Sequence, residues 1–174
     1  MSRDGTLHTG MNAAEGQLIP LRFRLNGVEQ SLTVEPRELL LDVIRERLHL
    51  KGTKRSCDMQ VCGACTVLID GRPISSCTYL AFEVDGCEVL TIEGLARGGA
   101  LHPLQESFIT HGGFQCGFCT PGMILSAKAL LDRVVDPTDD EIAHFMEGNI
   151  CRCTGYKLIL ESIRAAAKKL RSRS

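Results

Sequence analysis

Apolar and polar residues alternate along residues 20–35, PLRFRLNGVEQSLTVE, on both sides of an Asn26–Gly27 pair. A period of two places successive side chains on opposite faces of a strand, and Asn-Gly favours the tight turn of a hairpin. Stretches at 66–70 (TVLID), 73–77 (PISSC) and 87–94 (CEVLTIEG) are also typical of strands, and an Asp-Gly turn separates the first two. The first part of the chain is therefore predicted to be rich in β-structure.

One helix is expected among these strands, in residues 36–50 (PRELLLDVIRERLHL). Its apolar side chains recur at helical spacing, Pro36 suits a first helical turn, and Gly52 follows as a stop. The order strand, strand, helix, strand, strand, strand predicts a small mixed sheet with one helix packed on it.

From about residue 100 the hydrophobic period changes to that of helices. Thr138 and Glu141 have the spacing of a capping box, and Gly148–Asn149 is typical of a helix end. The Gly-containing stretch 96–102 (ARGGALH) suits a domain boundary. Four helices are predicted, in LHPLQESFITHG, GMILSAKALLDRV, PTDDEIAHFMEG and YKLILESIRAAAKKLRSR. The chain is thus expected to be a β-rich half followed by an all-helical half.

The composition is that of an ordinary globular protein except for its cysteines. Of 174 residues 44% are hydrophobic, and the net charge of −1 provides no field that would attract nucleic acid. Residues 1–17 contain no apolar segment of a signal peptide, and no stretch reaches the ~18 apolar residues of a membrane span. We expect a disordered or extended tail at 1–17 and a cytoplasmic location. Nine cysteines in a reducing compartment favour metal ligands or redox groups over disulfides.

A first set of four cysteines lies in the β-rich half: Cys57, Cys62, Cys65 and Cys77. Four residues separate the first two, two residues separate the next pair, and eleven precede the last. A C-x₄-C-x₂-C run followed by a distant cysteine is the spacing of plant-type [2Fe–2S] sites. Gly63 would let the backbone approach such a cluster, so that amide groups could donate hydrogen bonds to its sulfurs.

A second set lies in the helical half: Cys116, Cys119, Cys151 and Cys153. Pro121 follows the CGFC motif at a position that suits a first helical turn, so this loop is expected to feed a helix N-terminus, where anions are stabilised. A disulfide between the two cysteines of CRC is disfavoured by its geometry. We expect these two thiols to bind one iron and the two of CGFC to bind the other.

The residues themselves leave other interpretations open. Two Cys₄ zinc sites would also use thiolates, although C-x₄-C-x₂-C and C-x-C fit structural zinc less well. A thioredoxin-like dithiol would use CGAC or CGFC and leave four cysteines without a role. Cys87 stands apart inside a predicted strand, where we interpret it as a buried small apolar residue. The five histidines have no partner at ligand spacing and are interpreted as surface or packing residues.

With both cysteine sets placed, the chain resembles the iron–sulfur subunit of the molybdenum hydroxylases, the xanthine dehydrogenase/aldehyde oxidoreductase family, which includes carbon monoxide dehydrogenase small subunits. The resemblance covers about residues 18–168 and rests on GTKRSCDMQVCGACTVLIDG, SC at 76–77, TIEGL, QCGFCTPGMI and GNICRCTGY. It implies an α+β fold: a plant-ferredoxin-like β-grasp [2Fe–2S] domain at 18–95, a linker at 96–102, and a four-helix [2Fe–2S] domain at 103–174 with a basic C-terminal end.

The resemblance also implies the task of the chain. The helical-domain cluster would lie nearest a molybdopterin, with Gln115 hydrogen-bonded to the pterin and Cys153 touching it. Molybdenum with molybdopterin, in its cytosine dinucleotide form, would belong to a large subunit, and FAD to a medium subunit that faces the β-grasp cluster. The chain would then be the electron-transfer subunit of an oxidoreductase, assembled as a dimer of heterotrimers and carrying no catalytic residue of its own. A free-standing [2Fe–2S] carrier or redox sensor, and a zinc-stabilised interaction module, are the competing hypotheses.

Overall fold

The computed structural model describes residues 18–172, whose five strands form one mixed sheet in the order β2-β1-β5-β3-β4. The strands are β1 (Ile19–Leu25), β2 (Val28–Val34), β3 (Thr66–Ile69), β4 (Arg72–Ser75) and β5 (Glu88–Leu90). β1 and β2 form the predicted hairpin, with Asn26 and Gly27 at positive φ of 54° and 82°. β1 pairs with β5 in parallel, whereas the other pairs are antiparallel. The tail predicted at 1–17 lies outside the described residues.

The helix of the β-rich half is shorter than expected. It consists of α1 (Leu40–Asp42) and a π-helical turn, η1 (Val43–Arg47). The prediction that Pro36 opens this helix is wrong, because Leu39 is extended and forms an isolated bridge with Leu80. The helix can therefore begin only after this contact, where Leu40 donates its N–H to the Tyr79 carbonyl at 2.8 Å.

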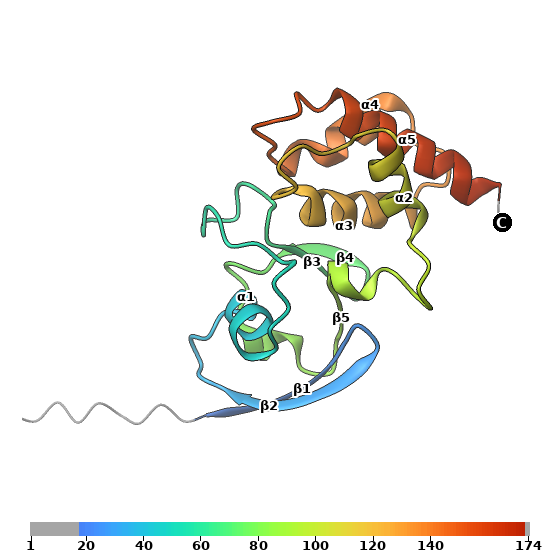
Figure 1. Ribbon diagram of the computed structural model, residues 1–174. Helices are drawn as coiled ribbons and strands as arrows, with labels where there is room; N and C mark the ends of the chain where they lie inside the picture. The colour runs from blue at the N-terminus through green and yellow to red at the C-terminus, as the bar shows by residue number, and fades with distance from the viewer. Residues whose placement is uncertain (1–17, 173–174) are drawn as a thin grey trace, which may run out of the picture.

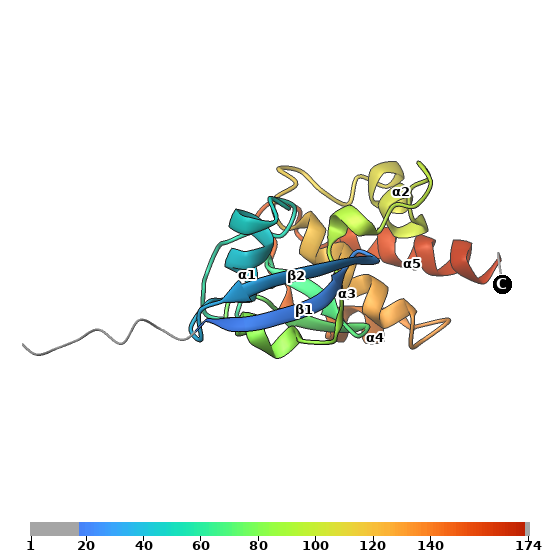
Figure 2. The same cartoon turned by 90° about the horizontal axis from the view of Figure 1, so that it is seen from below.

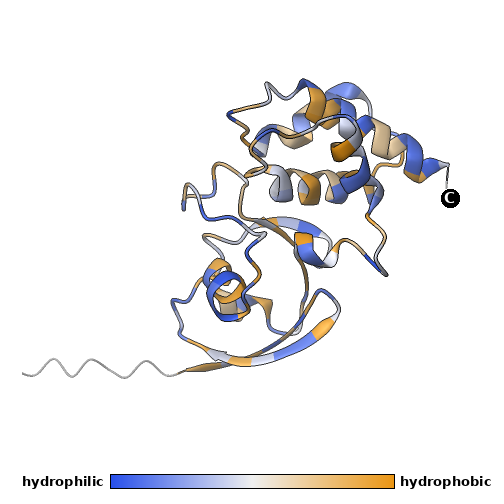
Figure 3. Cartoon of the chain, in the orientation of Figure 1, coloured by the Kyte–Doolittle hydropathy of each residue, from blue (hydrophilic) through white to orange (hydrophobic). Residues whose placement is uncertain are grey.

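The β-rich half has its own apolar core between the sheet and this helix. Leu40, Val43 and Ile44 are fully buried there, and they pack against inward-facing residues of the strands. Along the hairpin, apolar and polar positions alternate in the manner that the sequence predicted (Figure 3). Two short 3₁₀ turns, η2 (Ala81–Val84) and η3 (Ile92–Gly94), flank β5.

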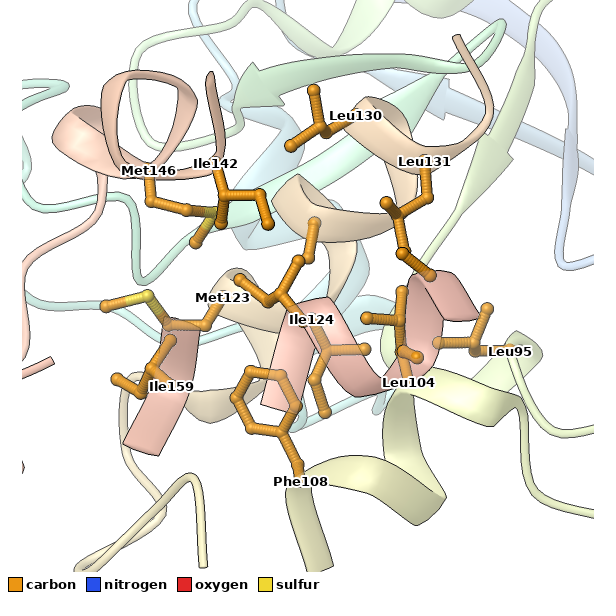
Figure 4. Close-up of a cluster of buried hydrophobic side chains, with 14 of the residues drawn as sticks. Leu95, Leu104, Phe108, Met123, Ile124, Leu130, Leu131, Ile142, Met146 and Ile159 are labelled. Atoms are coloured by element: carbon orange, nitrogen blue, oxygen red, sulfur yellow. The ribbon is translucent and has the colours of Figure 1, made fainter. Parts of the chain in front are cut away.

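The four predicted helices are present in the second half: α2 (Pro103–Thr110), α3 (Thr120–Leu131), α4 (Asp139–Phe145) and α5 (Lys157–Arg171). A 3₁₀ turn, η4 (Met146–Gly148), follows α4. The capping box at the start of α4 is confirmed: Glu141 donates its N–H to the Thr138 hydroxyl at 3.2 Å, and its carboxylate accepts the Thr138 N–H at 2.7 Å. Side chains from all four helices meet in one apolar core, in which Phe108 and Met123 are among the central residues (Figure 4).

The sheet and the helices meet where α3 lies against β3 (Figures 1 and 2). All four residues of β3 are buried. Val67 and Ile69 belong to the core of the β-rich half, whereas Leu68 between them packs against Leu125 and Ala129 of α3. Because side chains alternate between the faces of a strand, β3 is buried on both sides and joins the two halves.

Candidate metal centres

Three of the first four cysteines lie in the loop between η1 and β3, and the fourth follows β4: Cys57, Cys62, Cys65 and Cys77. Asp58 and Gln60 in this loop have positive φ of 52° and 62°, which non-glycine residues seldom adopt. Left-handed residues in a loop can turn successive N–H groups toward one side and so form a concave site for an anion. The backbone of this loop can therefore turn several N–H groups toward a negatively charged atom.

Cys57 is the thiol that this loop stabilises in its charged form. The backbone amides of Met59, Cys62 and Val61 together lower the pKa of Cys57 to about 6. The Cys62 N–H lies 3.4 Å from the Cys57 sulfur. A thiolate is the form that binds metal, so these amides prepare a ligand before any metal arrives.

Cys65 and Cys77 form the inner side of the first site. Both are buried and pack together with Leu41. Burial raises the pKa of Cys77 to about 11, and the contact with Cys65 acts in the same direction. The buried Cys77 thiol therefore stays protonated on its own and loses its proton when a cation binds, which couples metal binding to this part of the fold.

The second set of cysteines comes from two loops that both precede helices. Cys116 and Cys119 lie just before α3, and Cys151 and Cys153 lie between η4 and α5. The sulfurs of Cys116 and Cys153 are 3.6 Å apart, and the side chains of Cys119 and Cys151 are hydrogen-bonded neighbours. Two thiolates on one tetrahedral metal, at about 2.3 Å each, lie about 3.8 Å apart. The structure brings these sulfurs together across the two loops, and not within CRC and within CGFC as the sequence led us to expect.

The two inner thiols of this site differ in their surroundings. Burial raises the pKa of Cys119 to about 12, and the neighbouring Cys151 adds to the effect. Burial also acts to raise the pKa of Cys151, but hydrogen bonds from the Thr154 hydroxyl and from the amides of Thr154 and Cys153 outweigh it and lower this pKa. Cys151 therefore corresponds to Cys57 of the first site as a sulfur that polar groups prepare for negative charge.

A cavity of about 220 Å³ is bounded by this second site. Its lining includes all four sulfur-bearing residues: Cys116, Cys119, Cys151 and Cys153. Cys62 and Ala64 of the first loop also line it, together with the exposed Phe118 and Ile150. Four thiols paired two and two around a mainly apolar space fit the donor set of a [2Fe–2S] cluster, whose two irons each take two cysteines.

The two loops are held together by hydrogen bonds and close packing next to their cysteines. Ile150 donates its N–H to the Cys62 carbonyl at 2.9 Å, and the side-chain amide of Asn149 donates to the Gly63 carbonyl at 3.2 Å. Gly122 of α3 packs so closely that a Cβ atom there would lie 2.2 Å from the Gly63 oxygen. We call Gly63, Gly122, Asn149 and Ile150, with the Cys62 carbonyl, the inter-loop contact. The sequence predicted that the backbone at Gly63 approaches a cluster, and it assigned no role in a contact between the loops to any of these residues.

Family models agree with this division into two sites. Residues 23–90 match a 2Fe-2S iron-sulfur cluster binding domain, and residues 91–164 match a [2Fe-2S] binding domain. The small FeS subunit of nicotinate dehydrogenase from Eubacterium barkeri is 46% identical, over 87% of this chain and 96% of its own length. The iron-sulfur-binding subunit of aldehyde oxidoreductase from Escherichia coli (strain K12) is 45% identical, over 90% of this chain and 75% of its own. The chain belongs to the iron–sulfur subunits of the molybdenum hydroxylases.

The fold of this iron–sulfur subunit also agrees with a solved structure. A chain of quinoline 2-oxidoreductase from Pseudomonas putida 86 matches with a TM-score of 0.86 and 45% identity, and the match covers 90% of this chain and 98% of that one. The α+β fold with a ferredoxin-like part followed by a helical [2Fe–2S] part is thereby confirmed. As an iron–sulfur subunit it is part of an oxidoreductase and lacks a full active site of its own.

Two further candidate residues, Cys87 and Gln115, lie at different places in the fold. Cys87 is half-buried, one residue before β5, and packs against the core of the β-rich half, where burial and then Asp70 raise the pKa of its thiol. Gln115 is exposed beside Cys116. Within residues 18–172, no three His, Cys, Asp or Glu side chains are grouped closely enough to hold a single metal ion. None of the helices in this range is long and apolar enough to cross a membrane.

Proposed function

We propose that this subunit carries electrons, one at a time, from a molybdopterin centre on a large subunit through two [2Fe–2S] clusters to a flavin subunit. The observation that carries the proposal is the inter-loop contact, because it joins the two cysteine loops directly by hydrogen bonds. Each cluster, when bound, supplies a one-electron carrier. The protein's part is to hold the two carriers at a fixed separation, to shield them from water and to tune them.

The proposed ligands are the eight cysteines that the two loops and their partners bring together. One cluster would be held by Cys57, Cys62, Cys65 and Cys77, and the other by Cys116, Cys119, Cys151 and Cys153. The 3.6 Å separation of the Cys116 and Cys153 sulfurs supports one iron shared by these two residues. The contact between Cys119 and Cys151 supports a second iron shared by that pair. In the first site the contact between Cys65 and Cys77 supports one shared iron for these two residues. Cys57 and Cys62 would then bind the other iron.

A short route through this chain links the two sets of ligands. It runs from Cys62, a ligand of the first cluster, through its carbonyl oxygen to the Ile150 N–H and along the chain to Cys151, a ligand of the second. Only the 2.9 Å hydrogen bond between Ile150 and Cys62 interrupts the covalent path. This route lies inside the inter-loop contact, beside the buried residues Asn149 and Gly122.

The outer side of the second site supports a partner at that position. Cys116 and Cys153 are exposed, and the apolar side chains of Phe118 and Ile150 beside them are each 46% exposed. Large apolar side chains around a polar centre are typical of a protein interface. We propose that the large subunit covers this face, with Gln115 hydrogen-bonded to the pterin of its molybdopterin cytosine dinucleotide and Cys153 in contact with it.

The first site offers a separate surface for the second partner. Met59 and Val61, which flank the tip of its cysteine loop, are 66% and 54% exposed. We propose that the FAD-containing medium subunit docks here and that the complex is a dimer of heterotrimers in the cytoplasm. In this scheme residues 18–95 and 103–174 are the two cluster domains, and 96–102 is their linker. The relatives named above belong to enzymes of nicotinate, aldehydes and quinoline, and the choice among such substrates would be made by the large subunit.

Mild isolation of the native protein tests this function. We expect co-purification with a large molybdenum-containing and a medium FAD-containing subunit. We also expect equal amounts of iron and acid-labile sulfide, with two distinct EPR signals after reduction. A stable lone chain with both signals would point to a free-standing carrier instead. Stoichiometric zinc without acid-labile sulfide would overturn the ligand assignment as well.

A further inference from the structure

Thr154 directs two hydrogen-bond donors at one cysteine sulfur of the second site. Its hydroxyl oxygen lies 3.1 Å from the Cys151 sulfur, and its backbone nitrogen lies 3.4 Å from the same atom. Thr154 is half-buried, and Cys151 is 8% exposed. Both contacts are therefore partly shielded from water, which strengthens them relative to contacts on an open surface.

The direction of the hydroxyl proton follows from its other partner. The Tyr156 N–H donates to the same Thr154 oxygen at 3.2 Å. A backbone N–H can only donate, so the threonine oxygen accepts there and keeps its own proton for another acceptor. The Cys151 sulfur is the acceptor at hand, and as a metal ligand it carries negative charge.

Tyr156 is itself fixed in this position by the ligand loop. Its backbone has a positive φ of 68°, which is strained for a bulky residue, and its phenol oxygen accepts the Cys151 N–H at 3.0 Å. The Cys151 N–H, the Tyr156 phenol and amide, the Thr154 hydroxyl and the Cys151 sulfur thus form a closed ring of contacts. Such a ring keeps the hydroxyl oriented whether or not the cluster gains an electron.

We propose that Thr154 is a positioning residue that raises the reduction potential of the second cluster through its hydroxyl hydrogen bond to Cys151. Reduction adds one negative charge, which spreads onto the ligand sulfurs, and a donor aimed at such a sulfur stabilises the reduced form more than the oxidised form. This inference rests on the proposed function, because it requires Cys151 to be a cluster ligand.

The test compares Thr154→Val with Thr154→Ser in the full chain, purified with its clusters. Valine matches threonine in shape and keeps the backbone N–H but removes the hydroxyl, whereas serine keeps the hydroxyl. Each cluster is followed by its own EPR signal during a redox titration. Only the part of this charge-assisted hydrogen bond that strengthens on reduction changes the reduction constant, and for that part we expect Thr154→Val to lower the reduction constant of the second cluster about tenfold. For a one-electron couple this is a shift of about 59 mV to more negative potential.

Three comparisons decide the outcome. The first cluster should keep its potential in every variant, and Thr154→Ser should keep the wild-type potential of the second. Thr110→Val, which changes an exposed hydroxyl on α2, should leave both unchanged. A second-cluster potential in Thr154→Val equal to that of the wild type refutes the proposal.

If Thr154→Val fails to hold its cluster, the same titration compares Thr154→Ser with Thr154→Ala. Equal potentials in that pair refute the role of the hydroxyl, and a more negative potential for alanine supports it. A wild-type protein that lacks the second EPR signal altogether instead overturns the ligand assignment on which the proposal rests.

Discussion

Replacing Gly122 with alanine should force the two cysteine loops apart. The added Cβ would lie 2.2 Å from the Gly63 carbonyl oxygen and 3.2 Å from its carbonyl carbon. Heavy atoms in contact prefer separations of roughly 3.5–4.0 Å, so the new methyl group is more than about 1 Å too close. Both partners are backbone, one in the first turn of α3 and the other in the first cysteine loop, so no flexible side chain can move aside.

The expected cost follows from the contacts that the movement would break. Overpacking in a tight core typically costs about 1–3 kcal/mol. Separating the loops also weakens the hydrogen bonds from Ile150 to Cys62 and from Asn149 to Gly63, each worth about 1 kcal/mol. Alanine recovers up to about 1 kcal/mol through its better helix propensity. We therefore expect Gly122→Ala to lower the free energy of unfolding by about 2–4 kcal/mol.

Gly148→Ala is the matched control. Among the described residues, no heavy atom outside its immediate neighbours lies within 4 Å of a Cβ built on Gly148, and its φ is not positive. The free energy of unfolding of Gly148→Ala should stay within about 0.5 kcal/mol of the wild-type value. The assay is urea unfolding of the cluster-containing chain by circular dichroism, together with the magnetic interaction between the two reduced clusters by EPR. Gly122→Ala should unfold at lower urea and show a weaker interaction. Equal midpoints and equal interaction in both variants would refute the tight contact at Gly63.

Three further changes test separate parts of the argument. Cys153→Ser should damage the second cluster and leave the EPR signal of the first cluster intact. Cys87→Ala is the control and should keep both signals. Loss of both signals in a folded Cys153→Ser protein would contradict the two-site assignment. Asn149→Ala should lower the free energy of unfolding by about 1–3 kcal/mol, because the buried Gly63 carbonyl loses the hydrogen bond from the Asn149 side-chain amide. An unchanged urea midpoint would show that this hydrogen bond contributes nothing to stability. Thr138→Ala should cost about 1 kcal/mol through loss of the α4 cap, measured by thermal unfolding, whereas a neutral result would mean that tertiary packing alone holds this helix.

The elements that the sequence predicted well are those whose cause is local. The β1–β2 hairpin follows from the Asn26–Gly27 pair and the alternation around it, because turn chemistry and period together fix the register. The start of α4 follows from Thr138 and Glu141, which are three residues apart and need no distant partner. The two sets of cysteines could also be recognised from the sequence, because ligand chemistry restricts residue type and spacing.

The features that the sequence did not predict depend on distant partners. The helix that was expected from Pro36 begins only at Leu40, because Leu39 is held in an extended conformation by Leu80. The pairing of Cys116 with Cys153 joins sulfurs 37 positions apart, and the spacing within CRC says nothing about it. A periodic pattern reports which face of an element is buried, but not which distant residue meets it.

The inter-loop contact explains why the two sites need no rigid linker to stay at a fixed separation. Gly63 directly follows Cys62, and Ile150 directly precedes Cys151, so each hydrogen bond across the contact is made by a cysteine or by a residue at most two positions from one. A displacement of either cysteine loop therefore moves backbone atoms that the other loop binds. The Gly63 carbonyl accepts the Asn149 side-chain amide and lies close against Gly122. Moving the loops apart would break the hydrogen bond, and moving them together would cause a clash at Gly122. The separation of the sites is thus set where the loops touch.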